Sequence, residues 1–138
     1  MKYIKYAALL LFLISFALPA CRPDRDAYSG WACFQFCFTV LSERGVSGLW
    51  KFYYLGFAVI NFTALVLFVI SFLQKRRSVI CISLGVFVLF YALSFLGLNF
   101  VEFERQGKLL VDYGYYAWVL SFVFLVAALV ANRSSSEP

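Results

Sequence analysis

The chain has 138 residues, of which 64% are hydrophobic and only 14% are charged, with a net charge of +5. A soluble domain carries roughly 25% charged residues, so the composition excludes an ordinary soluble enzyme and favours an integral membrane protein. The length suits one compact bundle, and we predict a single membrane domain over residues 1–138. Because the positive charge forms no stripe along a water-facing element, we expect no nucleic-acid partner.

Four apolar segments without any Asp, Glu, Lys or Arg make up most of the chain. A helix needs about 20 apolar residues to cross a hydrocarbon core, and it satisfies its own backbone hydrogen bonds there. We therefore predict an all-α, polytopic membrane protein in the lipid bilayer, with four transmembrane helices and a short external amphipathic helix. The predicted spans are residues 4–20, 50–73, 78–100 and 113–131.

The first segment admits two interpretations. Lys2 and Lys5 precede an apolar run over residues 6–18, which is the pattern of an export signal. The Leu-Pro-Ala-Cys sequence at residues 18–21 resembles the lipobox of bacterial lipoproteins, in which cleavage is followed by lipidation of the cysteine. Pro19 departs from that pattern. We favour a retained helix that ends at this proline, because three later spans already anchor the chain.

Two segments, residues 21–49 and 101–112, are expected outside the membrane. The apolar run 31–42 is too short to span, and its periodicity fits a helix or a strand. As a helix, it gathers bulky side chains on one face: Trp31, Phe34, Phe38 and Leu41. We predict an interfacial helix. Residues 101–112 either form a hairpin or extend the two adjoining spans, and the sequence leaves both open.

Basic residues next to the membrane indicate the orientation of the spans. An even number of spans places six basic residues on one side of the membrane, in very short segments: Lys2, Lys5, Lys75, Arg76, Arg77 and Arg133. Six more are spread over the longer segments of the other side, so a count alone is a tie. Since the positive-inside rule is strongest for short segments, we predict a bacterial inner (plasma) membrane protein with both termini and residues 74–77 in the cytoplasm.

The spans contain few groups that could support chemistry. The chain has no His, which removes the commonest general base and most catalytic zinc sites, and no span contains a carboxylate. We therefore expect no catalytic residue, no metal and no cofactor. Asn61, Tyr91 and Ser94 are predicted to form polar contacts between helices. As an alternative, they would line a path for a small solute.

Three cysteines, Cys21, Cys33 and Cys37, are expected on the oxidising side of the membrane, as a disulfide or redox site. Cys33 and Cys37 share a helical face and could bridge with some strain, whereas a bridge from Cys21 to either is easier. A small four-helix membrane protein with external cysteines resembles quinone-linked thiol oxidases, which implies an oxidoreductase using Cys33 and Cys37. Those enzymes have a Cys-x-x-Cys pair and a second pair in the other external loop, whereas this chain has Cys-x-x-x-Cys and no cysteine in residues 101–112.

A looser resemblance covers the whole chain. A first span closing in Leu-Pro-Ala, a Gly-Trp in the external loop and Tyr-Gly-Tyr-Tyr-Ala-Trp at residues 113–118 resemble small uncharacterised bacterial inner-membrane proteins with four helices. This resemblance implies a topology and no activity. We expect a non-enzymatic protein that packs with itself or with a membrane partner, since Ala127 and Ala131 permit close helix contact. The alternatives are a thiol oxidoreductase and a small-solute transporter or channel.

Overall fold

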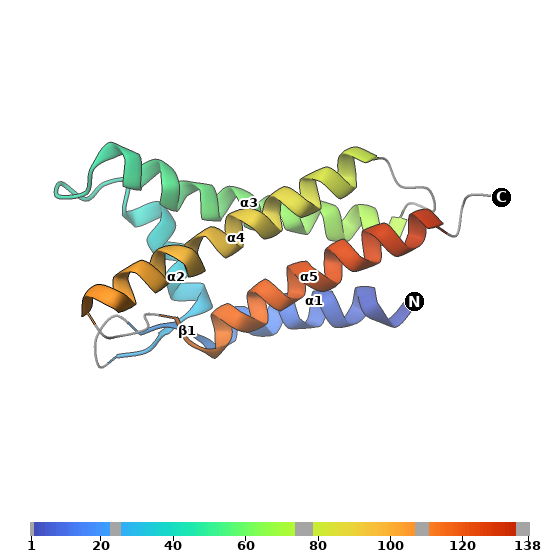
Figure 1. Cartoon of the computed structure of the whole chain (residues 1–138), viewed down its shortest axis with the longest axis horizontal. Coiled ribbons are helices and arrows are strands. Elements are labelled where there is room, and N and C mark those ends of the chain that lie inside the picture. The colour runs from blue at the N-terminus through green and yellow to red at the C-terminus, as the bar shows by residue number, and fades with distance from the viewer. Residues whose placement is uncertain (1, 23–25, 74–78, 107–110, 135–138) are drawn as a thin grey trace.

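The computed structural model describes residues 2–22, 26–73, 79–106 and 111–134. These residues form five helices and two short strands: α1 (Lys2–Ala17), β1 (Pro19–Cys21), β2 (Tyr28–Ser29), α2 (Gly30–Thr39), α3 (Gly48–Leu73), α4 (Val79–Gln106) and α5 (Tyr113–Ser134). Figure 1 shows α1, α3, α4 and α5 running along one long axis, whereas α2 crosses one end of the bundle. The predicted predominantly helical fold is confirmed.

Three helical stretches are long and apolar enough to cross a membrane: Gly48–Leu73, Val79–Leu98 and Tyr113–Ala131. The apolar part of α1, Tyr3–Ala17, is shorter. The 16 residues of α1 rise about 24 Å, less than the ~30 Å of a hydrocarbon core. The protein is therefore a helical membrane protein with three candidate spans, and the fourth span stays a prediction.

The first helix ends earlier than the sequence predicts. A span was expected over residues 4–20, but α1 stops at Ala17 and β1 begins at Pro19. A proline disfavours helical geometry at the residue before it, which here is Leu18. Strand β1 pairs antiparallel with β2, and Cys21 also forms an isolated bridge with Val111. The end of the first segment therefore pairs with two other parts of the chain, β2 and Val111, instead of forming a helical turn.

The sequence left the conformation of residues 31–42 and 101–112 open, and most of the described part of each segment is helical. The run after Gly30 is the helix α2, and the Ser29 hydroxyl caps it by accepting a hydrogen bond from the Ala32 N–H at 3.2 Å. Helix α4 continues to Gln106, beyond the predicted end at residue 100. Residues 101–106 therefore extend the helix instead of forming one arm of a hairpin, and residues 107–110 lie outside the described residues.

Aromatic side chains fill the centre of the bundle. Figure 1 shows α1 lying alongside α5. The Phe12 ring of α1 is fully buried, with its centroid 5.4 Å from that of Phe68 and 5.9 Å from that of Phe122. Phe87 and Phe90 on α4 are exposed, as expected for side chains that face lipid. The apolar exterior and the aromatic interior both suit a helical bundle in a bilayer.

The ends of the chain share one end of the bundle. Figure 1 shows the start of α1 and the end of α5 at the same end, opposite β1. There the Lys5 ammonium donates a hydrogen bond to the Ser71 carbonyl at 2.8 Å, near the C-terminus of α3, where carbonyls carry partial negative charge. Lys2 lies in the first turn of α1 and Arg133 in the last turn of α5. Lys75, Arg76 and Arg77 lie outside the described residues.

The start of α2 packs directly against the end of α1. A Cβ atom at Gly30 would lie 2.9 Å from the Phe16 Cα and closer still to the Ser15 carbonyl oxygen. The Gly30 N–H also donates a hydrogen bond to the Leu18 carbonyl at 2.9 Å. Because the obstructing atoms belong to the backbone, no side-chain rotation could make room for a methyl group.

We expect Gly30→Ala to lower the free energy of unfolding by about 1–3 kcal/mol, the usual cost of overpacking. The matched control is Gly97→Ala in α4, where a Cβ atom would meet nothing within 4 Å. This control is expected to be neutral or slightly stabilising, since alanine favours helix over glycine. Thermal unfolding of the two variants in detergent, followed by circular dichroism, checks the difference. Equal midpoints for Gly30→Ala and Gly97→Ala would contradict this account of the α1–α2 contact.

Candidate functional site

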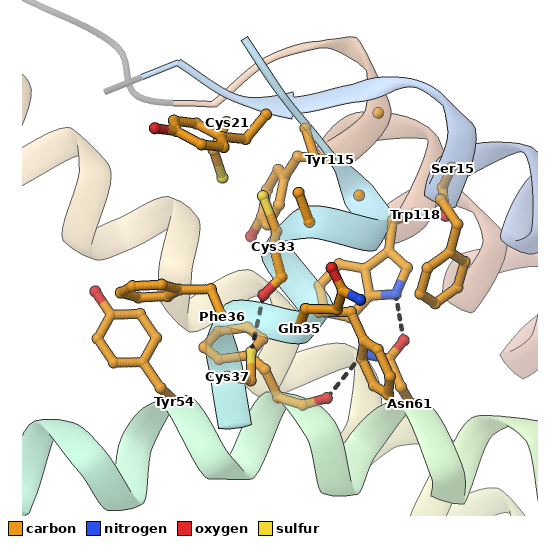
Figure 2. Close-up of a pocket in the computed structure, with 18 of the residues that line it drawn as sticks. Ser15, Cys21, Cys33, Gln35, Phe36, Cys37, Tyr54, Asn61, Tyr115 and Trp118 are labelled. Atoms are coloured by element: carbon orange, nitrogen blue, oxygen red, sulfur yellow. Dashed lines mark hydrogen bonds between the residues drawn. The ribbon is translucent and has the colours of Figure 1, made fainter. Parts of the chain in front are cut away.

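A cavity of about 660 Å³ lies at the end of the bundle that holds β1 and α2. Its volume falls within the roughly 300–1,000 Å³ of small-molecule sites. Most of its walls are apolar, and aromatic rings from α2, α3 and α5 dominate: Phe34, Phe36, Tyr54, Phe57, Tyr115 and Trp118. Figure 2 shows these helices converging on the cavity, with β1 and β2 closing one side.

Three of the four cysteines line this cavity. Cys21 comes from β1, whereas Cys33 and Cys37 come from α2, one helical turn apart. The thiols of Cys21 and Cys33 lie beside each other, and Figure 2 shows their sulfur atoms close together. The Cys37 thiol instead donates to the Cys33 carbonyl oxygen at 3.3 Å. The fourth cysteine, Cys81, is buried in the first turn of α4, at the other end of the bundle.

The backbone around Cys21 is held on two sides. On one side β1 pairs with β2, and on the other Cys21 bridges Val111, the last residue but one before α5. The Asp112 N–H donates to the Ala20 carbonyl at 2.9 Å, and the Arg22 guanidinium forms an ion pair with the Asp112 carboxylate at 3.0 Å. These contacts fix the position of the Cys21 thiol although it lies in a segment that connects two helices.

The thiol pair is electrostatically asymmetric. The hydrogen bond donated by the Cys21 thiol stabilises the Cys33 thiolate and lowers the pKa of Cys33. The same hydrogen bond, together with burial, raises the pKa of Cys21. Burial raises the pKa of the Cys37 thiol to about 12. The thiolate is the reactive form of a cysteine, and in this pair Cys33 is the thiol that ionises more readily.

The structure pairs the cysteines differently from the thiol-oxidase hypothesis. That hypothesis used Cys33 with Cys37, but the thiol in contact with Cys33 is that of Cys21. Cys37 lies four residues after Cys33, so its thiol reaches the carbonyl of the preceding turn, as hydroxyl side chains do within helices. Among the residues that the structure describes, no group of three or more His, Cys, Asp or Glu side chains is placed to hold a metal ion.

Asn61 lies on the cavity wall, where it links α3 to α5. It is buried, with its amide nitrogen donating to the Phe57 carbonyl at 2.8 Å and its oxygen accepting from the Trp118 indole nitrogen, also at 2.8 Å. Figure 2 shows both hydrogen bonds. The sequence pointed to Asn61 because its amide cannot be satisfied within one helix. Trp118 was not among the predicted polar contacts, although a buried indole N–H also needs a partner.

Tyr91 and Ser94 belong to a different contact. The Tyr91 hydroxyl donates to the Tyr53 carbonyl at 2.7 Å, and the Ser94 hydroxyl lies 2.8 Å from the Tyr53 hydroxyl. These hydrogen bonds join α3 to α4, and neither Tyr91 nor Ser94 lines the cavity. Of Asn61, Tyr91 and Ser94, only Asn61 lines the cavity. The three residues therefore do not form a common polar path, and the hypothesis of a small-solute transporter or channel gains no support.

No protein-family model, curated protein or solved structure matches the chain. The chemistry of the site therefore follows from its geometry: a thiol pair built from β1 and α2, at the wall of an apolar cavity, in a part of the chain outside the three candidate spans.

The asymmetry of the thiol pair predicts a pH dependence for alkylation. In Cys21→Ala the Cys33 thiolate loses its hydrogen-bond donor, so the Cys33 pKa rises and less thiolate is present at neutral pH. A pKa higher by one lowers the thiolate fraction by at most about tenfold, and by that much where the pKa lies well above the pH. We expect the rate of Cys33 alkylation by iodoacetamide to fall accordingly and its pH midpoint to move upward, as measured by peptide mass spectrometry.

The control for this experiment is Cys37→Ala. The Cys37 thiol contacts the Cys33 carbonyl and not its sulfur, so this variant should keep the wild-type alkylation profile of Cys33. A Cys33 profile that is unchanged in Cys21→Ala, or that moves equally in both variants, would contradict the hydrogen bond between the two thiols.

Proposed function

We propose that this protein performs thiol–disulfide exchange at the outer face of the bacterial inner membrane, with Cys21 and Cys33 as the redox pair. The observation that carries the proposal is that these two thiols, which come from separate elements, lie close together at an open cavity. A thiol with a lowered pKa beside a second thiol is the arrangement that exchange requires.

The partner is an exported protein that carries a disulfide or a dithiol. The Cys33 thiolate attacks one sulfur of the partner disulfide, and the other sulfur leaves as a thiolate that takes up a proton. Cys21 then loses its proton and attacks Cys33, which forms the Cys21–Cys33 disulfide and releases the partner as a dithiol. Two electrons pass from the cysteine pair to the partner, and the same steps in reverse oxidise a dithiol partner.

Exchange on the outer face requires the predicted topology. We propose that α1 is a fourth transmembrane helix and that both termini are cytoplasmic. The burial of Phe12 against Phe68 and Phe122 supports a retained α1. Aromatic residues begin α3 and α5 at the cavity end, where headgroups favour them, and the basic residues Lys5 of α1 and Arg133 of α5 lie at the opposite end. In this orientation the thiol pair faces an oxidising compartment.

The lipoprotein interpretation excludes this function. Cleavage before Cys21 would remove α1, and lipidation would block the Cys21 sulfur. The proposal therefore requires residues 1–20 to be retained. The expected role as a non-enzymatic packing subunit, as a homo-oligomer or with a membrane partner, stays a prediction. It rests on the spacing of Ala127 and Ala131, which is common in such helices, whereas the thiol contact needs two separate elements to be brought together.

The test is the redox state of exported thiol proteins in cells that express Cys21→Ser/Cys33→Ser. We expect the ratio of oxidised to reduced exported proteins to change, because the exchange pair is lost, as measured by alkylation and gel shift. Cys81→Ser is the matched control, since Cys81 lies at the other end of the bundle, and it should behave as wild type.

The single variant Cys21→Ser provides a second readout. It keeps the nucleophile and removes the resolving thiol, so mixed disulfides at Cys33 should accumulate. Unchanged exported proteins in the double variant, together with no mixed disulfide at Cys33 in Cys21→Ser, would refute the proposed function.

A further inference from the structure

We propose that the cavity binds a neutral, lipid-soluble molecule with an aromatic ring and a carbonyl oxygen, held between α2 and α3. This inference goes beyond thiol–disulfide exchange and does not depend on it, because it rests on the walls of the cavity and not on the reactivity of the thiols. Three properties of the walls support it: their charge, their aromatic rings and their unused hydrogen-bond donors.

The cavity suits a neutral apolar ligand. None of the described residues that line it is charged, and most of the wall is apolar. An ion would lose its hydration there without gaining an opposite charge. The exposed side chains of Gln35 and Phe36 on α2 contribute to the lining, so the cavity is open along this helix. A ligand dissolved in the membrane or its interface could therefore reach it.

The rings of the wall favour an aromatic ligand over an acyl chain. The centroids of Phe57 and Trp118 are 6.0 Å apart, those of Tyr115 and Trp118 are 5.8 Å apart, and Phe36 meets Tyr54 edge-on at 5.6 Å. These are the spacings at which aromatic rings attract one another through their quadrupoles. A bound ring gains such contacts in addition to its burial, whereas an acyl chain gains burial alone.

The polar groups of the wall offer donors to a ligand oxygen. The Asn61 amide has two N–H groups, and one of them donates to the Phe57 carbonyl, which leaves the second for a ligand. The Gln35 amide has no hydrogen-bond partner among the described residues. The Ser15 and Tyr115 hydroxyls also line the cavity, but both donate to backbone carbonyls. A carbonyl oxygen is an acceptor only, so it matches these two amides.

The test uses benzophenone, a lipid-soluble diaryl ketone that inserts into nearby C–H bonds when illuminated. The full-length protein is reconstituted in liposomes, labelled over a range of benzophenone concentrations and mapped by peptide mass spectrometry. We expect saturable labelling of the cavity-lining segments of α2 and α3. A photoactivatable diazirine fatty acid, used in parallel, should label the exposed outer faces of the helices without saturation.

Two variants locate the binding. Ala32 lines the cavity, so Ala32→Phe would fill part of it and should abolish saturable labelling. The control, Ala7→Phe, lies on the exposed face of α1 and should have no effect. Gln35→Leu removes a donor that makes no contact needed for folding, so it remains informative if Ala32→Phe fails to fold. It should weaken half-saturation about fivefold, the usual effect of losing one hydrogen bond.

The outcomes separate this inference from the proposed function. Labelling that does not saturate, or that is the same in wild type, Ala32→Phe and Gln35→Leu, would overturn the inference. So would saturable labelling of the cavity by the fatty acid, because the occupant would then be an acyl chain. Saturable benzophenone labelling that persists in Cys21→Ser/Cys33→Ser supports the inference, whatever the redox state of exported proteins shows about the thiols.

Discussion

Pro19 has no backbone N–H and disfavours helical geometry at Leu18, so α1 stops at Ala17 and the following residues are available to pair as β1. The rest of the end of the bundle that holds β1 and α2 depends on this break. Pairing with β2 brings the chain back to the end of α1, where α2 begins at Gly30 in contact with the Ser15 carbonyl. A helix that continued through residue 20 would leave no strand for β2 to pair with and would carry Cys21 away from Cys33.

The thiol pair is a consequence of this arrangement. Cys21 is fixed by strand pairing and by the Arg22–Asp112 ion pair, and Cys33 is fixed by its place in the second turn of α2. The two sulfurs meet because α2 crosses the end of the bundle beside β1. The interaction of the two thiols lowers the pKa of Cys33 and raises that of Cys21, which gives each a separate role in the exchange that we propose. Helix α2 also crosses α3 and α5, and this crossing encloses the cavity. The position of α2 therefore accounts for both the thiol pair and the aromatic walls.

Much of the fold could be predicted from the sequence, because lipid imposes a simple rule. A segment without charges and about 20 residues long satisfies its backbone hydrogen bonds as a helix, and α3, α4 and α5 follow that rule. The shorter segments were harder to predict. Residues 31–42 fit a helix and a strand equally by periodicity, and only the Ser29 cap and the contacts of α2 with α3 show why the helix forms. The extension of α4 to Gln106 crosses charged residues that hydropathy places outside the membrane.

Single residues of the site could be predicted from the sequence, but their contacts with one another could not. The sequence singled out Asn61 and the three external cysteines, since a buried amide and paired thiols need partners. It could not show that Cys21 meets Cys33, because that contact depends on a strand pairing between short segments without a strong pattern. The cavity could not be predicted either. Residues such as Gln35, Phe57 and Trp118 are far apart in the sequence, and the pattern around each is typical of any helix. Trp118 carried the one usable signal, an indole N–H that requires an acceptor when buried.

The central claim is that Cys21 and Cys33 form a reversible pair in a chain that keeps its first helix. The most direct measurement is the intact mass and disulfide map of the membrane-purified protein, alkylated before and after reduction. This account predicts the mass of the retained chain and a Cys21–Cys33 disulfide that reductant opens, with Cys81 alkylated regardless of reduction once the protein is unfolded. Loss of residues 1–20 with lipid on Cys21, or Cys21 and Cys33 thiols that stay free after exposure to an oxidant, would contradict it.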